Sequence, residues 1–190
     1  MQDATEKNLD LEVPLNKKLD DLYELIDGIE ICMFTTRRRD GYLVSRAMGV
    51  QKRENGSDLW FVTDIETDKL DELEQDPHVN VAFYRDGTRE WVSVSGTARI
   101  SRNRDEIRRL YKSSWSIWFP DEGGARNGSV EDPRITLIHV DAHSVSYFKK
   151  DRPAPAVLFE LAKARLSGRA PKLGDLREVS SGELERDRAR

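Results

Sequence analysis

The stretch Trp91-Val92-Ser93-Val94-Ser95-Gly96-Thr97-Ala98-Arg99-Ile100 decides the fold class of this chain. Its length and its valines set among small residues are typical of a long β-strand with small side chains on one side. Gly96 interrupts this strand. An interior glycine marks a bulge or a close approach of two backbones, which is how barrels turn corners. The stretch therefore favours a barrel.

Shorter runs of strand character lie on both sides of this stretch, and turn residues separate them. Helices are predicted between the runs at 67–75 and 104–112. Several short strands at roughly 10-residue spacing indicate an antiparallel barrel rather than parallel βαβ units. We expect about seven strands in total, the others covering 29–36, 42–51, 58–63, 79–84, 134–141 and 143–149, with a turn at 141–143 between the last two.

The two ends of the chain differ from the strand-rich centre. The flexible N-terminus is expected to cover 1–13, and the barrel domain 14–150, which opens with a helix. That helix is predicted to end near Gly28, because Leu15, Leu19, Leu22 and Ile26 lie on one of its faces. The segment 151–190 contains a proline hinge, an amphipathic helix at 156–167 with Val157, Leu158, Leu161 and Leu166 apolar, and a charged, loose tail at 168–190.

Composition excludes several classes of protein. The 190 residues are 37% hydrophobic and 35% charged, which suits one domain with a tail. The 31 Lys and Arg stand against 35 Asp and Glu, so a general nucleic-acid-binding face is not expected. No apolar run approaches the length of about 18 residues that spans a membrane, and we expect a cytoplasmic protein. Cys32 is the only cysteine and is interpreted as a small buried hydrophobe.

Residues for metal or nucleotide chemistry do not form recognisable motifs. His78, His139 and His143 lack metal-ligand spacing, so no metal is expected. The glycines at 123, 124 and 128 follow a proline and belong to no phosphate-binding motif, so we interpret them as a loop.

An anion site is predicted where a strand end meets a helix start. Thr63 ends a strand, and Thr67 and Lys69 open the helix at 67–75. The N-terminus of a helix presents unpaired N–H groups, so these residues and Arg46 could hold a phosphate together. The alternative is ordinary capping by Thr67, the helix dipole being satisfied by neighbouring acidic residues.

Three tryptophans have two interpretations. Taken singly, Trp91, Trp115 and Trp118 are typical core residues. Taken together, with Trp115 and Trp118 close to Phe119-Pro120 and a long loop, they are the wall of a site for a planar aromatic ligand.

The stretch from Cys32 to Phe148 resembles the pyridoxamine 5′-phosphate oxidase-like split barrel, and within that family the general stress protein branch that binds flavin. The order and spacing of short segments carry this resemblance. The matching segments are Phe34-Thr35-Thr36 with Asp40-Gly41, Ser45-Arg46-Ala47-Met48, Asp58-Leu59-Trp60-Phe61-Val62-Thr63 with Thr67, Lys69 and Leu70, Asp76-Pro77-His78-Val79-Asn80-Val81, Trp91 to Ala98, and Trp118-Phe119-Pro120.

The resemblance implies a six-stranded antiparallel split β-barrel with flanking helices, assembled as a homodimer with FMN at the subunit interface. It places the residues matching Arg46 to Gln51 along the flavin and those matching Thr67 and Lys69 at its phosphate. No catalytic residue is assigned. The implied cofactor-binding residues are Arg46, Ala47, Met48, Gly49, Gln51, Val62, Thr63, Thr67, Lys69, Trp91 and Trp118.

Departures from the oxidases bear on activity. After Phe148 the chain has no histidine, whereas oxidases of the vitamer end in an arginine–histidine pair. Gln51 is neutral where they have a lysine, and Asp68 is acidic where they have a basic residue. We expect an FMN-dependent oxidoreductase acting on an unknown small molecule other than the vitamer. The alternative is a non-catalytic module that binds or senses a flavin, deazaflavin or haem.

Overall fold

The computed structural model describes residues 9–10, 13–53, 58–150, 154–167, 171 and 174–189. The chain divides into two compact units. One comprises residues 1–30, 81–94 and 143–190, and the other comprises residues 31–80 and 95–142. The second unit contains the candidate site.

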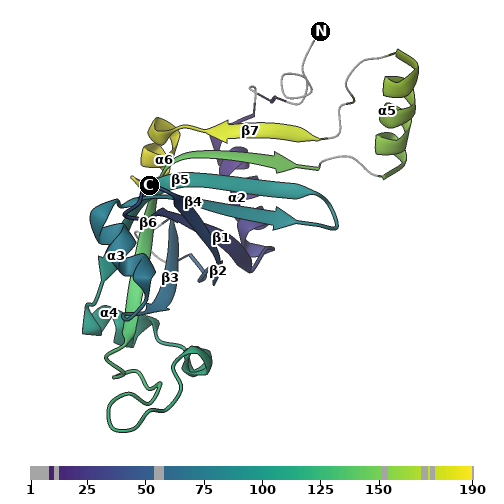
Figure 1. The fold of residues 1–190 in the computed structure, drawn as a ribbon. Coiled ribbons are helices and arrows are strands. Elements are labelled where there is room, and N and C mark those ends of the chain that lie inside the picture. Colours follow the sequence, from purple (N-terminus) through teal and green to yellow (C-terminus); the bar gives the residue numbers. More distant parts are fainter. Residues whose placement is uncertain are drawn as a thin grey trace. The chain divides into compact units, whose positions relative to one another are not determined.

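Seven strands form one sheet, in the order β2-β1-β4-β5-β6-β3, and β7 pairs with β6 outside that path (Figure 1). The registered pairs β1·β2, β3·β6 and β6·β7 are all antiparallel. The predicted class, a mostly antiparallel sheet with flanking helices, is confirmed, with seven strands where the resemblance implies six. The strands are β1 (Ile31–Arg37), β2 (Leu43–Gly49), β3 (Leu59–Asp64), β4 (His78–Arg85), β5 (Glu90–Ser101), β6 (Ile135–Lys149) and β7 (Asp175–Val179).

The first unit opens with α2 (Leu15–Asp27), which confirms the predicted helix. Pro14 precedes it, and Gly28 ends it. The buried residues follow helical periodicity because one face of the helix packs inward. They are Leu19, Asp21, Leu22, Leu25 and Ile26.

The second unit contains α3 (Asp68–Gln75), α4 (Arg104–Leu110) and the short 3-10 helix η1 (Ser113–Trp118). Asn103 caps α4, its side chain accepting from the N–H groups of Asp105 and Glu106. A hydrophobic cluster joins these helices to β3 and β6. Its buried members are Trp60, Ile107, Leu110, Trp115, Phe119, Ile135 and Leu137.

Gly96 lies where two strands approach closely, as its place within a strand predicts. A Cβ at this position would lie 2.4 Å from the carbonyl oxygen of Asp141. Only a residue without a side chain fits at this distance, because real Cβ atoms do not approach a carbonyl oxygen so closely.

The expectation of two strands at 134–141 and 143–149 is wrong. β6 runs without a break from Ile135 to Lys149. The residues read as a turn, Asp141-Ala142-His143, continue the strand, and the N–H of Ala142 donates to the Asp58 carboxylate at 2.7 Å. The Asp58 carboxylate is a hydrogen-bond acceptor within the sheet. It lies far from Ala142 in the sequence, so the residues around 141–143 do not indicate it.

The expectation of a loose tail at 168–190 is wrong for the residues described there. β7 pairs with the end of β6, from Val145↔Val179 to Lys149↔Asp175. A further helix, α6 (Ser181–Arg188), follows it, with Ser180 and Glu183 forming a capping box. This segment buries Val179 and Leu184, and charge pairing adds further stabilising contacts.

That charge pairing centres on Arg177. Its guanidinium binds the carboxylates of Asp21, Asp175 at 3.2 Å and Asp10 at 3.3 Å. Lys149 also binds Asp21, at 2.7 Å. The pKa of Asp21 lies below its usual range: burial raises it, but hydrogen bonds from Lys149, Lys17 and Arg177 outweigh this.

The remaining terminal expectations have mixed outcomes. Most of the N-terminus at 1–13 lies outside the described residues, although Leu9 bridges to Leu176. The helix predicted at 156–167 is present as α5 (Ala154–Ser167). Among its described apolar side chains, Phe159 is 68% and Leu166 is 91% exposed. No helix in the described part of the chain is long and apolar enough to cross a membrane.

Candidate functional site

A pocket of about 440 Å³ lies in the second unit, between the edge of the sheet and η1. This volume is within the range of about 300–1,000 Å³ that small-molecule sites occupy. All the predicted cofactor-binding residues line it except Thr67 and Trp91. The lining residues are Ile31, Arg46, Ala47, Met48, Gly49, Gln51, Val62, Thr63, Asp64, Lys69, Trp115, Trp118 and Phe119.

Strand pairing carries β2 along this pocket. β2 ends the printed strand order and pairs with β1 from Ile31↔Gly49 to Arg37↔Leu43. Because side chains alternate along a strand, Arg46 and Met48 share one face of β2 while Ala47 and Gly49 share the other. The lack of a large side chain at Ala47 and Gly49 leaves the backbone of the strand accessible to a ligand.

One end of the pocket is cationic. The Lys69 ammonium donates to the Thr63 hydroxyl at 2.7 Å. The Arg46 guanidinium donates to the Thr36 hydroxyl at 2.7 Å and to the Glu72 carboxylate at 2.8 Å. Burial, and then the nearby Arg46 charge, lower the pKa of Lys69 to about 8. The two positive charges repel each other, and partial burial makes both charged forms less favourable. An anion bound between or beside them would relieve this repulsion.

The other end of the pocket is aromatic. Trp115 and Phe119 are buried, whereas Trp118 is 78% exposed at the rim. Trp115 packs edge to face against Trp60, with ring centroids 6.1 Å apart, and against Tyr111 at 5.6 Å. These contacts fix the Trp115 ring, so the wall of the pocket is rigid on its inner side.

Two predicted residues lie elsewhere. Thr67 holds the N-cap position of α3, but its hydroxyl donates to the Asp64 carbonyl at 2.9 Å and makes no capping bond. The alternative interpretation, capping by the Thr67 side chain, is therefore wrong. Thr67 stays close to the pocket through the Thr63 hydroxyl, 3.4 Å away. Trp91 belongs to the first unit, and it is not among the lining residues.

Sequence reasoning missed several residues of the site. Ile31 begins β1 opposite the predicted residue Gly49, and Asp64 ends β3 directly after the predicted residue Thr63. Trp115, interpreted as a core residue or as part of a wall, is both buried and lining, and so is Phe119, which was not assigned to the site. Glu72 was also missed, although it lies one turn beyond Lys69 on α3, a spacing that places two side chains on one helix face.

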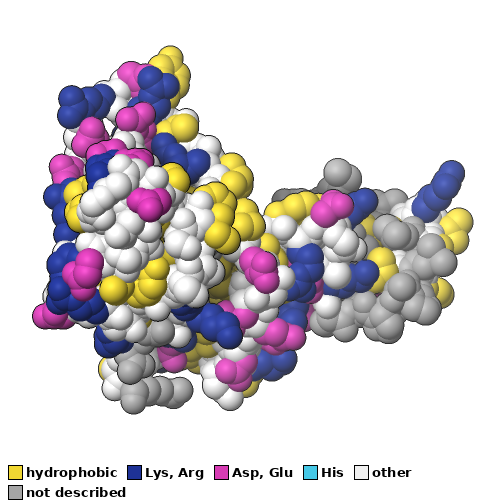
Figure 2. Space-filling view, turned by 90° about the horizontal axis from the view of Figure 1, so that it is seen from below, with side chains coloured by type: hydrophobic (Ala, Val, Ile, Leu, Met, Phe, Trp, Pro, Cys, Tyr) yellow, Lys and Arg dark blue, Asp and Glu magenta, His cyan; other side chains and the backbone are white. Residues whose placement is uncertain are grey.

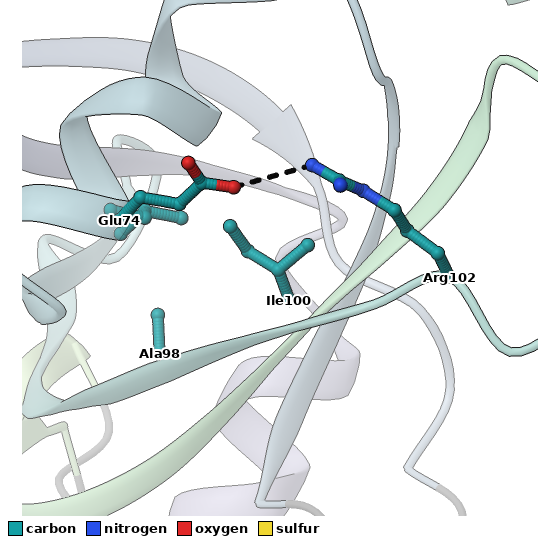
Figure 3. Close-up of a pocket in the computed structure, with 5 residues that line it drawn as sticks. Glu74, Ala98, Ile100 and Arg102 are labelled. Carbon is teal, nitrogen blue, oxygen red and sulfur yellow. Dashed lines mark hydrogen bonds and ion pairs between the residues drawn. The ribbon is translucent and has the colours of Figure 1, made fainter.

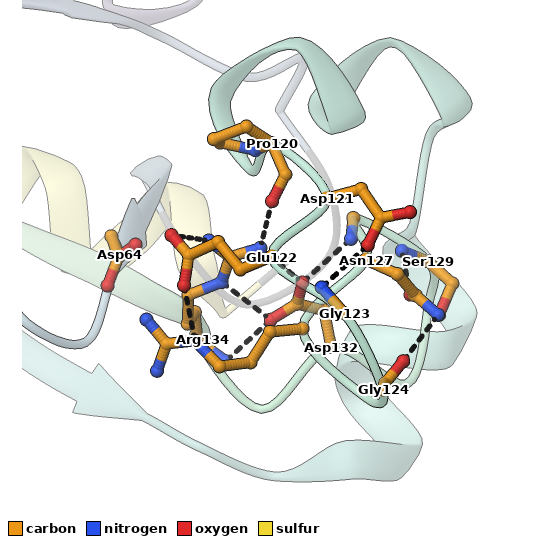
Figure 4. A network of polar contacts seen from close by, with 12 residues as sticks. Asp64, Pro120, Asp121, Glu122, Gly123, Gly124, Asn127, Ser129, Asp132 and Arg134 are labelled. Atoms are coloured by element: carbon orange, nitrogen blue, oxygen red, sulfur yellow. Dashed lines mark hydrogen bonds and ion pairs between the residues drawn. The ribbon is translucent and has the colours of Figure 1, made fainter.

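The long loop after η1 is held by a buried ion pair (Figure 4). Arg134 and Asp132 are fully buried and bonded at 2.7 and 3.0 Å, and Asp132 also accepts from the N–H of Gly128. Hydrogen bonds from Arg134 hold the pKa of Asp132 far below its usual range. Arg134 further binds Glu122 and the Pro120 carbonyl, next to the aromatic wall.

A second pair fastens the same loop to the turn before α3. Arg126 binds both carboxylate oxygens of Glu66, at 2.7 and 3.0 Å, and it binds Glu122 at 2.7 Å. A bidentate arginine–carboxylate pair has a defined geometry as well as a favourable energy. The loop that follows Phe119 and the turn that follows Asp64 are therefore held together.

A smaller hollow between α3 and β5 contrasts with this pocket (Figure 3). It measures about 400 Å³ and is lined by Leu73, Glu74, Ala98, Ile100 and Arg102. Glu74 and Arg102 bind each other across it at 3.3 Å. Its two charges are paired and its side chains largely aliphatic, so it lacks the cationic and aromatic ends of the main pocket.

Charge is mixed on the face drawn in Figure 2, where basic and acidic side chains are interspersed. No group of three or more His, Cys, Asp or Glu side chains suited to a metal ion occurs among the described residues. Cys32 is buried, as predicted, and burial raises the pKa of its thiol to about 12. His139 faces Glu106 at 3.1 Å, and burial lowers the pKa of its imidazole.

Comparison with known proteins agrees with this architecture. The family described as pyridoxamine 5′-phosphate oxidase like matches residues 17–172. The chain belongs to this family. Within the pyridoxamine 5′-phosphate oxidase-like family, a curated relative is "Protein bli-3" of Neurospora crassa, 37% identical over 181 residues that cover 94% of this chain and 87% of the relative.

Solved structures of the pyridoxamine 5′-phosphate oxidase-like type share the fold. A putative general stress protein 26 from Jannaschia sp. CCS1 is 20% identical with a TM-score of 0.65, covering 87% of this chain and 99% of that chain. A protein from Xanthomonas citri, described as a general stress FMN/FAD binding protein, is 22% identical with a TM-score of 0.57, covering 73% and 94%. At these identities the likeness establishes the split-barrel fold.

Proposed function

We propose that this protein binds FMN in the pocket between β2, β3 and η1 and transfers electrons between the flavin and a small molecule. One observation carries the proposal: the residues that line the pocket combine the Arg46 and Lys69 cations with the aromatic side chains of Trp115 and Phe119. FMN joins a phosphate to a planar ring system, so its two parts match these two kinds of lining residue.

The cationic end fits a phosphate monoester. Lys69 and Thr63 offer an ammonium and a hydroxyl, and Arg46 offers a planar guanidinium. Charge-assisted bonds of this kind are the strong class of hydrogen bond, each worth about 1.5–3 kcal/mol. A dianionic phosphate beside Lys69 also relieves the repulsion from Arg46 that lowers the pKa of Lys69.

The aromatic end fits an extended ring. Trp115 and Phe119 supply apolar surface, Gln51 supplies an amide, and Gly49 leaves the strand backbone open to hydrogen bonding. Pockets of this kind bind by apolar contact and use a few placed polar groups for orientation. A flavin bound there supplies the redox chemistry, and the chain positions it and excludes water.

We propose in addition that the protein forms a homodimer and that a second copy covers the outer face of β1 and β2. The pairs Ile31↔Gly49 and Met33↔Ala47 put apolar residues together on this face, and Ile31 is 57% and Met33 is 44% exposed. Ile31 also lines the pocket. Exposed apolar patches of this kind mark interaction sites, and a partner there would close the pocket on its open side.

The test is the absorption spectrum of the purified protein, followed by titration of FMN into protein freed of any bound flavin. We expect flavin absorbance bands and saturable binding. Lys69→Met and Arg46→Gln should each weaken binding by about one to two powers of ten, the loss of one charge-assisted bond. Light scattering on the same samples measures the oligomeric state, which we expect to be a dimer. Protein that is colourless and does not bind added FMN contradicts the proposal.

A second measurement distinguishes the proposed oxidoreductase from the alternative, a module that binds a flavin, deazaflavin or haem without turnover. An electron donor such as a reduced nicotinamide is mixed with the loaded protein. An oxidoreductase bleaches the flavin quickly and regains its colour when an electron-accepting substrate is added. Bound flavin that bleaches no faster than free flavin favours the binding module.

A further inference from the structure

The Gln51 side chain lies at the aromatic end of the pocket, and two donors fix its orientation. Its amide oxygen accepts from the Lys112 ammonium at 3.3 Å and from the Trp115 indole N–H at 3.3 Å. Neither Lys112 nor Trp115 can accept a hydrogen bond at these atoms. The oxygen rather than the nitrogen of the amide must therefore face them.

Lys112 is itself held in place. It precedes η1, and its carbonyl accepts from the N–H of Trp115 at 2.9 Å. Its ammonium lies 5.8 Å from the centroid of the Trp60 ring, a cation–π contact. The Trp60 indole N–H in turn donates to the Lys52 carbonyl at 2.7 Å. The ammonium thus has a defined position behind Gln51, outside the set of lining residues.

Two consequences follow for the Gln51 amide. An amide is planar, so two donors on its oxygen direct the nitrogen and its two hydrogens to the opposite side. A cation bound to the oxygen also polarises the amide and makes its N–H groups stronger donors. Gln51 therefore presents donors rather than an acceptor to a ligand in the pocket.

We propose that Lys112 is a positioning residue that, together with Trp115, sets the Gln51 amide as a hydrogen-bond donor and so selects ring systems that carry an acceptor, such as a ring carbonyl. This inference rests on the proposed flavin binding and deepens it.

The test is a double-mutant cycle on the full chain with two probes, FMN and 1-naphthyl phosphate. Both probes carry a phosphate and an aromatic ring, but only FMN has ring acceptors. We expect Lys112→Met to weaken FMN binding by about 3- to 10-fold, the worth of one neutral hydrogen bond. In a Gln51→Leu background the same change should alter FMN binding by less than about 2-fold, because the amide is absent. Binding of 1-naphthyl phosphate should be unchanged by Lys112→Met.

Controls separate positioning from folding and from net charge. Lys112→Arg keeps a cationic donor and should restore most of the FMN affinity. Lys163→Met removes the same charge from a residue outside the pocket and should leave both affinities unchanged. Thermal unfolding of each variant shows whether Lys112→Met still folds, and Lys112→Gln is the second variant if it does not.

Three outcomes overturn the inference. One is an effect of Lys112→Met that persists in the Gln51→Leu background, and another is an equal loss for 1-naphthyl phosphate. Both would show that Lys112 acts by charge alone. In these two cases the wild-type protein still binds FMN, so the proposed function stands. Wild-type protein that fails to bind FMN overturns the proposed function and the inference together.

Discussion

The Arg46 guanidinium and the Glu72 carboxylate form an ion pair at 2.8 Å, at the cationic end of the pocket. Glu72 therefore has two opposite effects on an anionic ligand. It holds Arg46 in position, and it opposes the positive charge that attracts the ligand. The Thr36 hydroxyl, which donates to Glu72 and accepts from Arg46, completes this arrangement.

Substituting Glu72 separates these effects. Glu72→Gln keeps an acceptor for Arg46 but removes the negative charge, so phosphate should bind more tightly, by roughly tenfold. Glu72→Ala also removes the acceptor, so its gain should be smaller or absent. Calorimetric titration with inorganic phosphate and with FMN measures both variants. Weaker phosphate binding by Glu72→Gln would contradict the electrostatic part of this prediction.

Lys69 makes anion binding depend on pH. Its pKa of about 8 leaves the ammonium partly deprotonated in mildly alkaline solution, and a bound phosphate raises that pKa. Binding should therefore take up protons above about pH 8, and affinity should fall as pH rises further. Titrations in buffers of different ionisation enthalpy measure the uptake. Lys69→Met should abolish it, and equal uptake in that variant would assign the proton to another group.

The lowered pKa of Lys69 also makes the stability of the folded protein depend on pH. A lysine with a lowered pKa in the folded state destabilises the folded protein at pH values where the unfolded chain is charged. The unliganded protein should therefore gain stability from this group as pH rises from about 8 towards the ordinary lysine value. Urea unfolding of wild-type protein and Lys69→Met across this range should show the gain in the wild type only.

The Asp132–Arg134 pair should make the loop sensitive to acid. The pKa of Asp132 is lowered in the folded state, so the group stabilises the protein above the ordinary carboxylate range and this contribution is lost as pH falls. Wild-type protein should lose more stability between neutral and acid pH than Asp132→Asn does. Urea unfolding measured at both pH values checks this. Parallel losses in the two proteins would show that Asp132 is not the group responsible.

Gly96→Ala should destabilise the second unit, because the new methyl group would lie 2.4 Å from the Asp141 carbonyl oxygen. Overpacking of this kind costs about 1–3 kcal/mol. Gly87→Ala is the matched control, since nothing lies within 4 Å of a Cβ there. Chemical unfolding gives both values. Equal stability of the two variants would mean that the strands can separate at no cost.

Arg177→Met should destabilise the first unit more strongly. The substitution removes the guanidinium that binds the buried Asp21 and Asp175 carboxylates, while Lys149 still binds Asp21. Removing one partner of a buried ion pair typically costs about 3–5 kcal/mol. Lys163→Met, which removes an exposed cation, is the control in the same unfolding measurement. A change within error of this control would indicate that water reaches the cluster.

Much of the fold could be predicted from local patterns. The helix at α2 follows from apolar residues three and four apart, and strands such as β1 and β3 follow from short apolar runs between turn residues. The close approach at Gly96 followed from a glycine inside a strand. Each of these depends on residues that are near one another in the chain.

The errors arose where distant residues decide the structure. β6 continues through 141–143 because Asp58, far away in the sequence, accepts from the backbone of Ala142. β7 is ordered because it pairs with β6, buries Val179 and places Arg177 against Asp21 and Asp10 at the other end of the chain. A charged segment is predicted to be loose when the residues that pair with it lie far away in the sequence.

The candidate site divides in the same way. The sequence predicted an anion site at Arg46, Thr63 and Lys69, of which Thr63 and Lys69 are close in the chain, and all three residues line one pocket. Folding was needed to bring Trp115 and Lys112 to Gln51 and to set Glu72 against Arg46, since these contacts join segments that the chain separates. The amino-acid pattern thus determined the elements and the cationic end of the pocket. Side-chain packing between remote segments determined its aromatic end and the orientation of the groups that line it.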